Sequence, residues 1–428
     1  MGDKWENLKI EDFGEVVSGG TPSTTIDEFW NGDIVWITPA DLSKERFPRI
    51  FTSQKKITPK GLKGSSATLI PKKSIVMSSR APIGYFAVPE VDFTTNQGCK
   101  SIKLNNGQDS FFHYYNFLQN KEVFKRRGEG TTFAEISKKE IEKLRFSIPS
   151  LSQQRKIAKI LSTCDTVIEK TEAAIAKYQA IKQGMMHDLF TRGIDLSTGK
   201  LRPKYEDAPE LYKASELGMI PREWEVKRLE ELIVTKPNYG INAPAVEFNS
   251  NYPTYLRITD IDDEGRFSEI GRKSVDHPFS KNYLLKHGDI VFARTGATVG
   301  KTFLYNNNEG KLVYAGFLIK VSPDPDLLVS KFLKYFTETN FYKNWILIMC
   351  QRSGQPGVNG NEYSKLPLPT PKYQEQKEVT EKINSISQKI KTEQSTLSKY
   401  RQIKSGLMQD LLSGAVEVKV NEEEFEIE

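Results

Sequence analysis

The sequence predicts an α+β protein in which two mixed β-rich domains are separated by two long helices that pair as an antiparallel coiled coil. Two observations carry this prediction. A long amphipathic stretch occurs twice, and a block of short β-branched runs precedes each copy. This duplicated order indicates internal pseudo-two-fold symmetry. The predicted boundaries are 1–148 for the first domain, 149–192 for the first helix, 193–221 for a linker, 222–370 for the second domain, 371–414 for the second helix and 415–428 for an acidic tail.

The two long stretches have apolar residues at heptad spacing, as in a helix with one apolar stripe. A shift of 222 residues, from Pro149 to Pro371, superposes the two stripes without a gap and also matches several polar residues. Each helix would be about 55 Å long at ~1.5 Å per residue, and two such narrow seams are buried most simply against each other. Thr171 and Glu393 interrupt the seam at matching positions, and an ordinary bundle helix is the alternative. The predicted pairing residues are Ile157, Leu161, Ile168, Ile175 and Tyr178 in the first helix and Val379, Ile383, Ile390, Leu397 and Tyr400 in the second.

Short runs of β-branched and aromatic residues, separated by Gly, Pro and Asn, predict strands in both blocks. WITPADL in the first block and YLRITDI in the second are one strand and turn in two copies. Helices are expected at 110–126 and 330–349. The predicted strands include 34–37, 75–77, 85–88, 255–258, 290–293 and 317–321.

Composition sets broad limits on function. A net charge of +6 and a pI near 8.8 are compatible with nucleic-acid binding but do not establish it. Three widely spaced cysteines form no CxxC pair, which favours reduced thiols. No apolar run approaches the length of a membrane span. We therefore expect a cytoplasmic protein without a membrane partner.

The sequence contains none of the catalytic motifs considered below. The segment from Gly296 to Thr302 approaches a phosphate-binding loop, but its first glycine is one residue late for GxxxxGK[ST]. The sequence has no (D/N)PP(Y/F) run, no GxGxxG after a strand and no zinc-ligand spacing. We expect a chain that is not an enzyme and has no catalytic residue, metal or cofactor of its own.

Loop residues at matching places in the two blocks are suited to reading polar edges. Arg, Asn and Gln form bidentate bonds to guanine and adenine, while Lys, Thr and Ser commonly hold phosphates. A surface loop explains any single one of them more simply, but the duplicated set favours nucleic acid. The candidate DNA-binding residues are Thr21, Ser23, Thr24, Arg80, Asn96, Gln97, Arg126, Arg127, Thr131 and Thr132 in the first block and Tyr239, Arg294, Thr295, Arg352, Ser353 and Gln355 in the second.

This layout resembles the DNA-specificity subunit of type I restriction-modification systems along nearly the whole chain. The motifs that carry the resemblance include WENLKIEDFGEVVSGGTPST, NGDIVWITPADL, SSRAPIGYFAV, LGMIPREWEVKRLEEL and LPLPTPKYQEQKEVTEKI. The resemblance implies that each β-rich block is a target recognition domain that reads one half of a bipartite, asymmetric double-stranded DNA target. It also implies that the helices set the spacer and dock two modification subunits, which bind S-adenosylmethionine and methylate adenine. Restriction subunits would join with ATP and magnesium.

The second block departs from the family pattern. It has KPNYG and RTGAT where the first block has GGTPS and SRAPIG, so the two halves should read different sequences. A coil that acts as a fixed ruler predicts half-site centres about one DNA turn apart. Two alternatives stay open: a self-contained DNA methyltransferase or nuclease with unusual motifs, and a coiled-coil scaffold unrelated to DNA.

Overall fold

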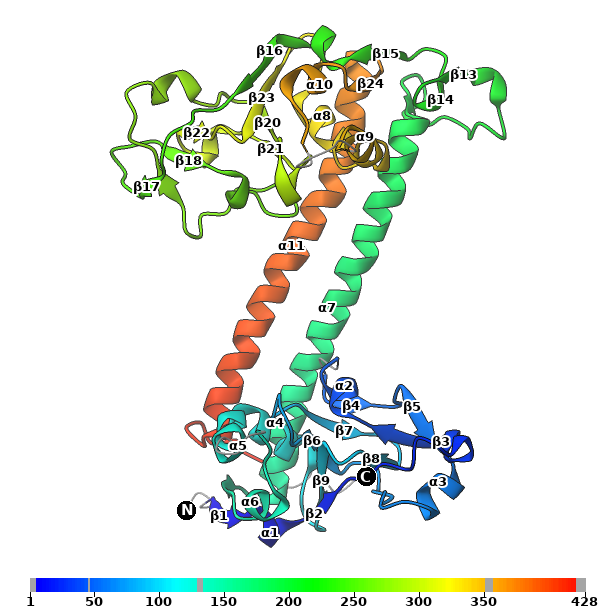
Figure 1. Ribbon diagram of the computed structural model, residues 1–428, viewed down its shortest axis with the longest axis vertical. Coiled ribbons are helices and arrows are strands. Elements are labelled where there is room, and N and C mark those ends of the chain that lie inside the picture. The colour runs from blue at the N-terminus through cyan, green and yellow to red at the C-terminus, as the bar shows by residue number, and fades with distance from the viewer. Residues whose placement is uncertain (1–4, 45–46, 129–133, 351–356, 421–428) are drawn as a thin grey trace. The chain divides into compact units, whose positions relative to one another are not determined.

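The computed structural model describes residues 5–44, 47–128, 134–350 and 357–420. The chain divides into two compact units, one formed by Met1–Ala174 with Glu393–Glu428 and the other by Ile175–Thr392. Each unit contains one β-rich domain together with part of each long helix (Figure 1). The predicted α+β class with two long helices is therefore confirmed.

The β-rich domain of the first unit is built on a five-stranded sheet of order β2-β9-β6-β7-β4 and a three-stranded sheet of order β5-β3-β8. Strands β1 and β10 pair antiparallel, which places Glu6 opposite Ile148 and joins the two ends of the domain. The elements are β1 Glu6–Lys9, α1 Ile10–Phe13, β2 Gly14–Ser18, β3 Trp30–Ile37, α2 Pro39–Leu42, β4 Arg49–Ile50, β5 Lys55–Ile57, α3 Pro59–Lys63, β6 Ile75–Ser78, β7 Phe86–Pro89, β8 Phe93–Thr95, β9 Cys99–Leu104, α4 Ser110–Gln119, α5 Lys121–Gly128, α6 Lys138–Glu142 and β10 Arg145–Ile148.

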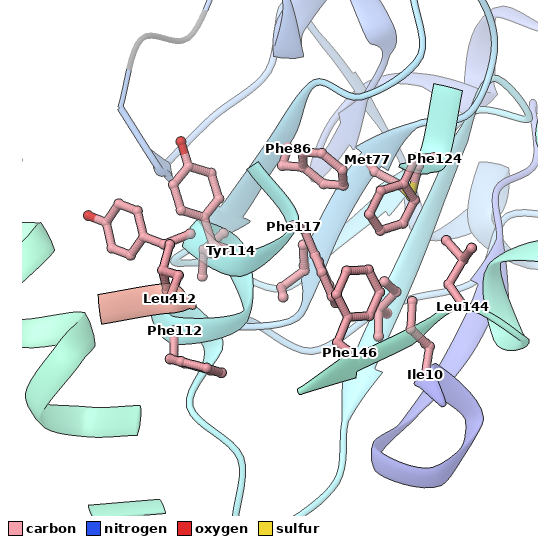
Figure 2. Packing of buried hydrophobic residues seen from close by; sticks show 14 of the residues in the cluster. Ile10, Met77, Phe86, Phe112, Tyr114, Phe117, Phe124, Leu144, Phe146 and Leu412 are labelled. Atoms are coloured by element: carbon pink, nitrogen blue, oxygen red, sulfur yellow. The ribbon is translucent and has the colours of Figure 1, made fainter. Parts of the chain in front are cut away.

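An aromatic core covers one side of this sheet. Figure 2 shows its residues from nearby, including Phe117, Phe124 and Phe146, whose ring centroids lie 5.0–5.7 Å apart. Large rings of this kind bury much apolar area and therefore dominate the stability of the domain. The same cluster includes Ile157 and Leu412 from the long helices, so the core is shared between sheet, short helices and coil.

The β-rich domain of the second unit has two four-stranded sheets, of orders β16-β23-β20-β21 and β17-β19-β18-β22. Strands β15 and β24 join the ends of the domain, as β1 and β10 do in the first unit. The elements are β15 Glu225–Arg228, β16 Ile233–Tyr239, β17 Val246–Glu247, β18 Thr254–Leu256, β19 Lys273–Ser274, β20 Ile290–Ala293, β21 Thr302–Leu304, β22 Leu312–Tyr314, β23 Leu318–Pro323, α8 Ser330–Phe336, α9 Asn340–Cys350, α10 Gly360–Ser364 and β24 Pro367–Thr370.

The long helices are α7, Leu151–Thr191, and α11, Tyr373–Leu412. In the first unit Leu161, near the start of α7, shares a core with Met408, near the end of α11. In the second unit Leu189, near the end of α7, shares a core with Val379, near the start of α11. The start of one helix therefore packs with the end of the other in both units, and the pairing is antiparallel.

Most predicted seam residues are buried. Ile157, Leu161, Ile168, Ile175, Val379, Ile383, Ile390 and Leu397 are buried, whereas Tyr178 and Tyr400 are half-buried. The Thr171 hydroxyl donates to the carbonyl of Val167 at 2.7 Å within its own helix, which explains how the seam tolerates it. Ile157, Leu161, Val379 and Ile383 also pack into the domain cores, so the ends of the seam are three-way contacts.

Side-chain hydrogen bonds repeat with the sequence. The Gln154 amide donates to the carbonyl of Pro149 at 3.0 Å and its oxygen accepts from the Asp109 amide at 2.9 Å. Gln376 donates in the same way to Pro371 at 3.1 Å and accepts from the Val329 amide at 2.9 Å. The duplication inferred from sequence thus extends to the bonds that attach each long helix to its domain.

Six predicted strand runs coincide with β3, β6, β7, β18, β20 and β23. The two predicted helices at 110–126 and 330–349 are wrong in one respect, because each is broken into two. Asn120 ends α4 by donating its side-chain amide to the carbonyl of Asn116 at 2.9 Å. Thr337 ends α8, where its hydroxyl bonds to the carbonyl of Lys334 at 2.7 Å. Such local side-chain bonds compete with the continuing helix.

The segment between α7 and β15 contains two hairpins, β11 Ile194–Asp195 with β12 Lys200–Leu201 and β13 Tyr212–Ser215 with β14 Gly218–Pro221. It is anchored to α11 by a buried carboxylate. Glu375 accepts from Arg202 at 2.6 Å, from the Ile194 amide at 2.8 Å and from the Trp224 indole at 3.1 Å. A buried charge is stable only when it is bonded in this way.

Candidate nucleic-acid interface

Three loops of the first domain leave the five-stranded sheet from one edge. β9 runs antiparallel to both β2 and β6, with Ser18 opposite Lys100 and Ser78 opposite Cys99. The ends of β2 and β6 and the start of β9 therefore lie together. We call the loops 19–25, 79–84 and 96–98 the first edge.

The first edge brings together candidates from three distant parts of the sequence. The Thr21 hydroxyl donates to the side-chain oxygen of Gln97, and the Asn96 side chain accepts from the Gly98 amide at 3.1 Å. The Ser79 amide donates to the Gly98 carbonyl at 2.9 Å, which holds the loop of Arg80 beside them. Ser23 and Thr24 are exposed on the same first loop. These side chains form a polar surface suited to base edges.

Arg80 is held by a carboxylate that sequence reasoning missed. Its Nε lies 2.9 Å from Glu135, and the buried Lys100 lies 3.5 Å from the other oxygen of the same carboxylate. Lys100 also lies 3.4 Å from the carbonyl of Gln97. The sequence signal for Lys100 was a charged residue within the run CKSIKL, which forms β9.

The remaining candidates of the first domain lie on or beyond α5. Arg126 and Arg127 are exposed, and Arg127 lies 3.4 Å from Glu140. A Cβ added at Gly128 would approach Ile83 at 2.3 Å, so the end of α5 packs against the first edge. Thr131 and Thr132 lie outside the described residues.

Cys99 begins β9 behind the first edge. Burial raises the pKa of its thiol well above the ordinary range, and the nearby Asp41 carboxylate adds to this effect. The thiol is therefore protonated at neutral pH, which is unlike a nucleophilic cysteine.

The second domain repeats this frame. β23 runs antiparallel to β16 and β20, with Tyr239 opposite Ile319 and Ala293 opposite Leu318. The Arg294 amide donates to the Phe317 carbonyl at 3.1 Å, as Ser79 does to Gly98 in the first domain. The loops after β16 and β20 and before β23 therefore form a matching second edge.

The same backbone frame carries different side chains in the two domains. Arg294 occupies the place of Ser79. The Arg294 carbonyl accepts from the Val358 amide at 2.9 Å, and the Ser79 carbonyl accepts from the Ile136 amide at the same distance. Phe317 occupies the place of Gly98, and this residue is 57% exposed. Sequence reasoning did not single out Phe317, although it begins a predicted strand.

Arg294 and Tyr239, both predicted, are brought into contact. The guanidinium carbon lies 4.8 Å from the centre of the Tyr239 ring. Thr295 follows directly and forms a backbone bridge with Gly357. Arg352, Ser353 and Gln355 lie outside the described residues.

The glycine loop beside Arg294 connects β20 to β21, which are antiparallel neighbours. A phosphate-binding loop leads from a strand into a helix, whose first amides face the phosphates. Lys301 is ion-paired with Asp263 at 2.5 Å. Because this loop leads into strand β21 rather than into a long helix, it is a hairpin connection between two antiparallel strands.

A family model described as the type I restriction modification DNA specificity domain matches residues 2–178 and again residues 221–399. This chain belongs to that family. Its two matched segments correspond to the two halves of the duplicated sequence. One of the two edges described above lies in each matched segment.

Individual relatives agree with the family. The MjaIX specificity subunit of Methanocaldococcus jannaschii is 37% identical over 260 residues, which span 59% of this chain and 57% of that relative. The MjaVIII specificity subunit of the same organism is 24% identical over 432 residues, spanning 97% of this chain and 94% of that relative. A crystal structure of the type I restriction-modification S subunit from M. genitalium has a TM-score of 0.61 at 15% identity and covers 97% of each chain. At that identity the likeness shows the fold. Among the described helices, none is long and apolar enough to cross a membrane.

Proposed function

We propose that this specificity subunit reads a bipartite, asymmetric double-stranded DNA target, with one half read by each domain. The observation that carries the proposal is the pair of edges, which share one backbone frame and differ in side chains. A common frame places both edges similarly on a half-site, while unlike side chains select different bases. The predicted boundaries, with domains at 1–148 and 222–370 and helices at 149–192 and 371–414, belong to this proposal.

The chain itself is proposed to be non-catalytic. We infer that two modification subunits dock on the long helices, bind S-adenosylmethionine and methylate an adenine in the target, and that restriction subunits join with ATP and magnesium. The buried, protonated Cys99 and the hairpin form of the glycine loop support this division, because neither resembles a group that performs chemistry. We place the complex in the cytoplasm, where the DNA is.

The test is to reconstitute the chain with its modification subunits, supply S-adenosylmethionine and a random-sequence DNA library, and map the methylated adenines. We expect one motif with two specified halves and an unread spacer. Gln97→Ala on the first edge should relax the first half only, because its amide is the group suited to a base edge there. The matched variant Arg294→Ala should relax the second half only.

Two results would contradict the proposal. Methylation by the chain alone would favour the alternative of a self-contained methyltransferase. Binding of the assembled complex that does not weaken between 50 and 200 mM salt would favour a scaffold unrelated to DNA, because phosphate contacts cause affinity to fall by roughly 10³-fold or more over that range.

A further inference from the structure

The second edge carries an arginine that rests on an aromatic ring. The Arg294 guanidinium lies against the Tyr239 ring at 4.8 Å, and the Tyr239 hydroxyl accepts from the Gly360 amide at 3.1 Å. The main chain of Arg294 is held on both sides, by the carbonyl of Phe317 at 3.1 Å and by the amide of Val358 at 2.9 Å. The ring therefore supports the guanidinium, and the backbone fixes where its side chain starts.

Arg294 differs from Arg80 and Arg257 in having no carboxylate partner among the described residues. Arg80 is bound by Glu135 at 2.9 Å, and Arg257 is bound by Asp260 at 2.6 Å. Along 5–44, 47–128, 134–350 and 357–420, no carboxylate lies within ion-pair distance of Arg294. Lys301, in the same loop, is ion-paired with Asp263. The N–H groups of Arg294 are therefore not neutralised by an acidic side chain in the described parts of the chain.

The surroundings favour a base over a phosphate as the ligand of this guanidinium. A guanidinium also binds phosphate, but phosphate binding does not require an aromatic support. Tyr239 is 42% exposed and Phe317 is 57% exposed, so two aromatic rings accompany the arginine at the surface. A planar guanidinium supported in this way matches the O6 and N7 atoms of guanine, which accept two parallel hydrogen bonds in the major groove.

The first edge lacks this arrangement. The places of Tyr239 and Arg294 are taken there by Ser18 and Ser79, as the strand register and the shared backbone bonds show. At these equivalent positions, the arginine on a tyrosine ring therefore occurs at the second edge and not at the first.

We propose that Arg294, supported by Tyr239, reads one guanine in the half-site of the second domain through bidentate hydrogen bonds. This inference rests on the proposed function and adds the identity of one base and the residue that selects it. Tyr239 is a positioning residue, because it acts through the orientation of Arg294.

The experiment maps methylation by the complete complex on random-sequence DNA, with wild-type chain, Arg294→Ala, Arg294→Lys, Tyr239→Phe and Tyr239→Leu. We expect wild type to require guanine at one position of the second half-site, and Arg294→Ala and Arg294→Lys to accept other bases there. Tyr239→Phe keeps the ring and should keep the requirement, whereas Tyr239→Leu should relax it. Arg80→Ala is the matched control and should leave the second half-site unchanged.

Replacing the selected guanine by 7-deazaguanine then removes one acceptor, N7. Binding of the wild-type complex should weaken by roughly tenfold, while binding of the Arg294→Ala complex should change little. Equal weakening of Arg294→Ala on all sequences with an unchanged motif would overturn the inference in favour of a phosphate contact. An unchanged motif with unchanged affinity would overturn it as well. A wild-type complex that yields no bipartite motif would instead contradict the proposed function.

Discussion

His113 is a residue whose ionisation is controlled by the fold. It lies within the aromatic core of the first domain, with its ring stacked on Phe13 at 4.6 Å and its Nε2 at 2.7 Å from the Gln108 side chain. Burial lowers the pKa of His113 to about 3. The native state therefore keeps the imidazole neutral under conditions in which the unfolded chain protonates it.

This difference predicts a pH dependence of stability. Between the unfolded pKa near 6.5 and the folded pKa of about 3, the unfolded state binds more protons, so the free energy of unfolding falls as pH falls. The slope from this residue approaches about 1.4 kcal/mol per pH unit. The free energy of unfolding of the first domain, measured by urea denaturation from pH 7 to pH 4.5, should fall less steeply with falling pH for His113→Phe than for wild type. Equal slopes would refute the effect.

At the scale of elements, each unit contains a lysine that joins a long helix to a tyrosine of its domain. In the first unit Lys404 of α11 lies 5.3 Å from the Tyr115 ring and pairs with Asp165 of α7 at 2.5 Å, while the Tyr115 hydroxyl donates to Asp165 at 2.6 Å. In the second unit Lys182 of α7 lies 5.4 Å from the Tyr335 ring and pairs with Glu338 at 2.8 Å. The repeated lysines of the sequence are thus repeated joints between coil and domain.

The joint of the first unit should be important for stability. Lys404→Met leaves Asp165 without its cation, and the Asp165 side chain is only 8% exposed, so we expect a loss of about 3–5 kcal/mol. The unfolding midpoint in urea measures this loss. Lys404→Met combined with Asp165→Asn should recover part of it, because the unpaired charge is then removed.

An exposed ion pair on the same two helices provides the control. Arg401 and Glu172 pair at 2.5 Å with Arg401 56% exposed, so Arg401→Met should cost less than about 1 kcal/mol. If the two methionine variants lose equal stability, the joint has no special role.

At the scale of the whole molecule, the proposed role of the long helices is to set the spacer between half-sites. Seven residues inserted after Ala174 in α7 and seven after Thr392 in α11 preserve the heptad seam. The insertion adds about 10 Å to each helix, which corresponds to about three base pairs at ~3.4 Å each. Methylation mapping on a library with variable spacers should show a longer preferred spacer. An insertion of four residues in one helix breaks the heptad seam and serves as the comparison. An unchanged preferred spacer in the variant with seven-residue insertions would refute the proposal that the helices set the spacer.

Much of the architecture was predictable from sequence because the signals were local or repeated. The heptad stripe predicted both long helices to within a few residues, and the β-branched runs predicted strands such as β20. The breaks at Asn120 and Thr337 were not predictable from periodicity, because single side-chain bonds caused them. Several candidate residues lie in loops that meet at one edge of each domain, and this convergence could not be derived from spacing alone.

The duplication, the two long amphipathic helices and the family can be read from the amino-acid sequence alone, because periodicity and repeated residues are properties of the chain read in order. The fold was needed to see that Thr21 contacts Gln97, that Glu135 pairs with Arg80 and that Arg294 rests on Tyr239. These contacts join residues that are far apart in the chain, and strand register sets them. Strand register depends on how whole sheets bury their apolar faces, so it becomes readable only when the fold is known.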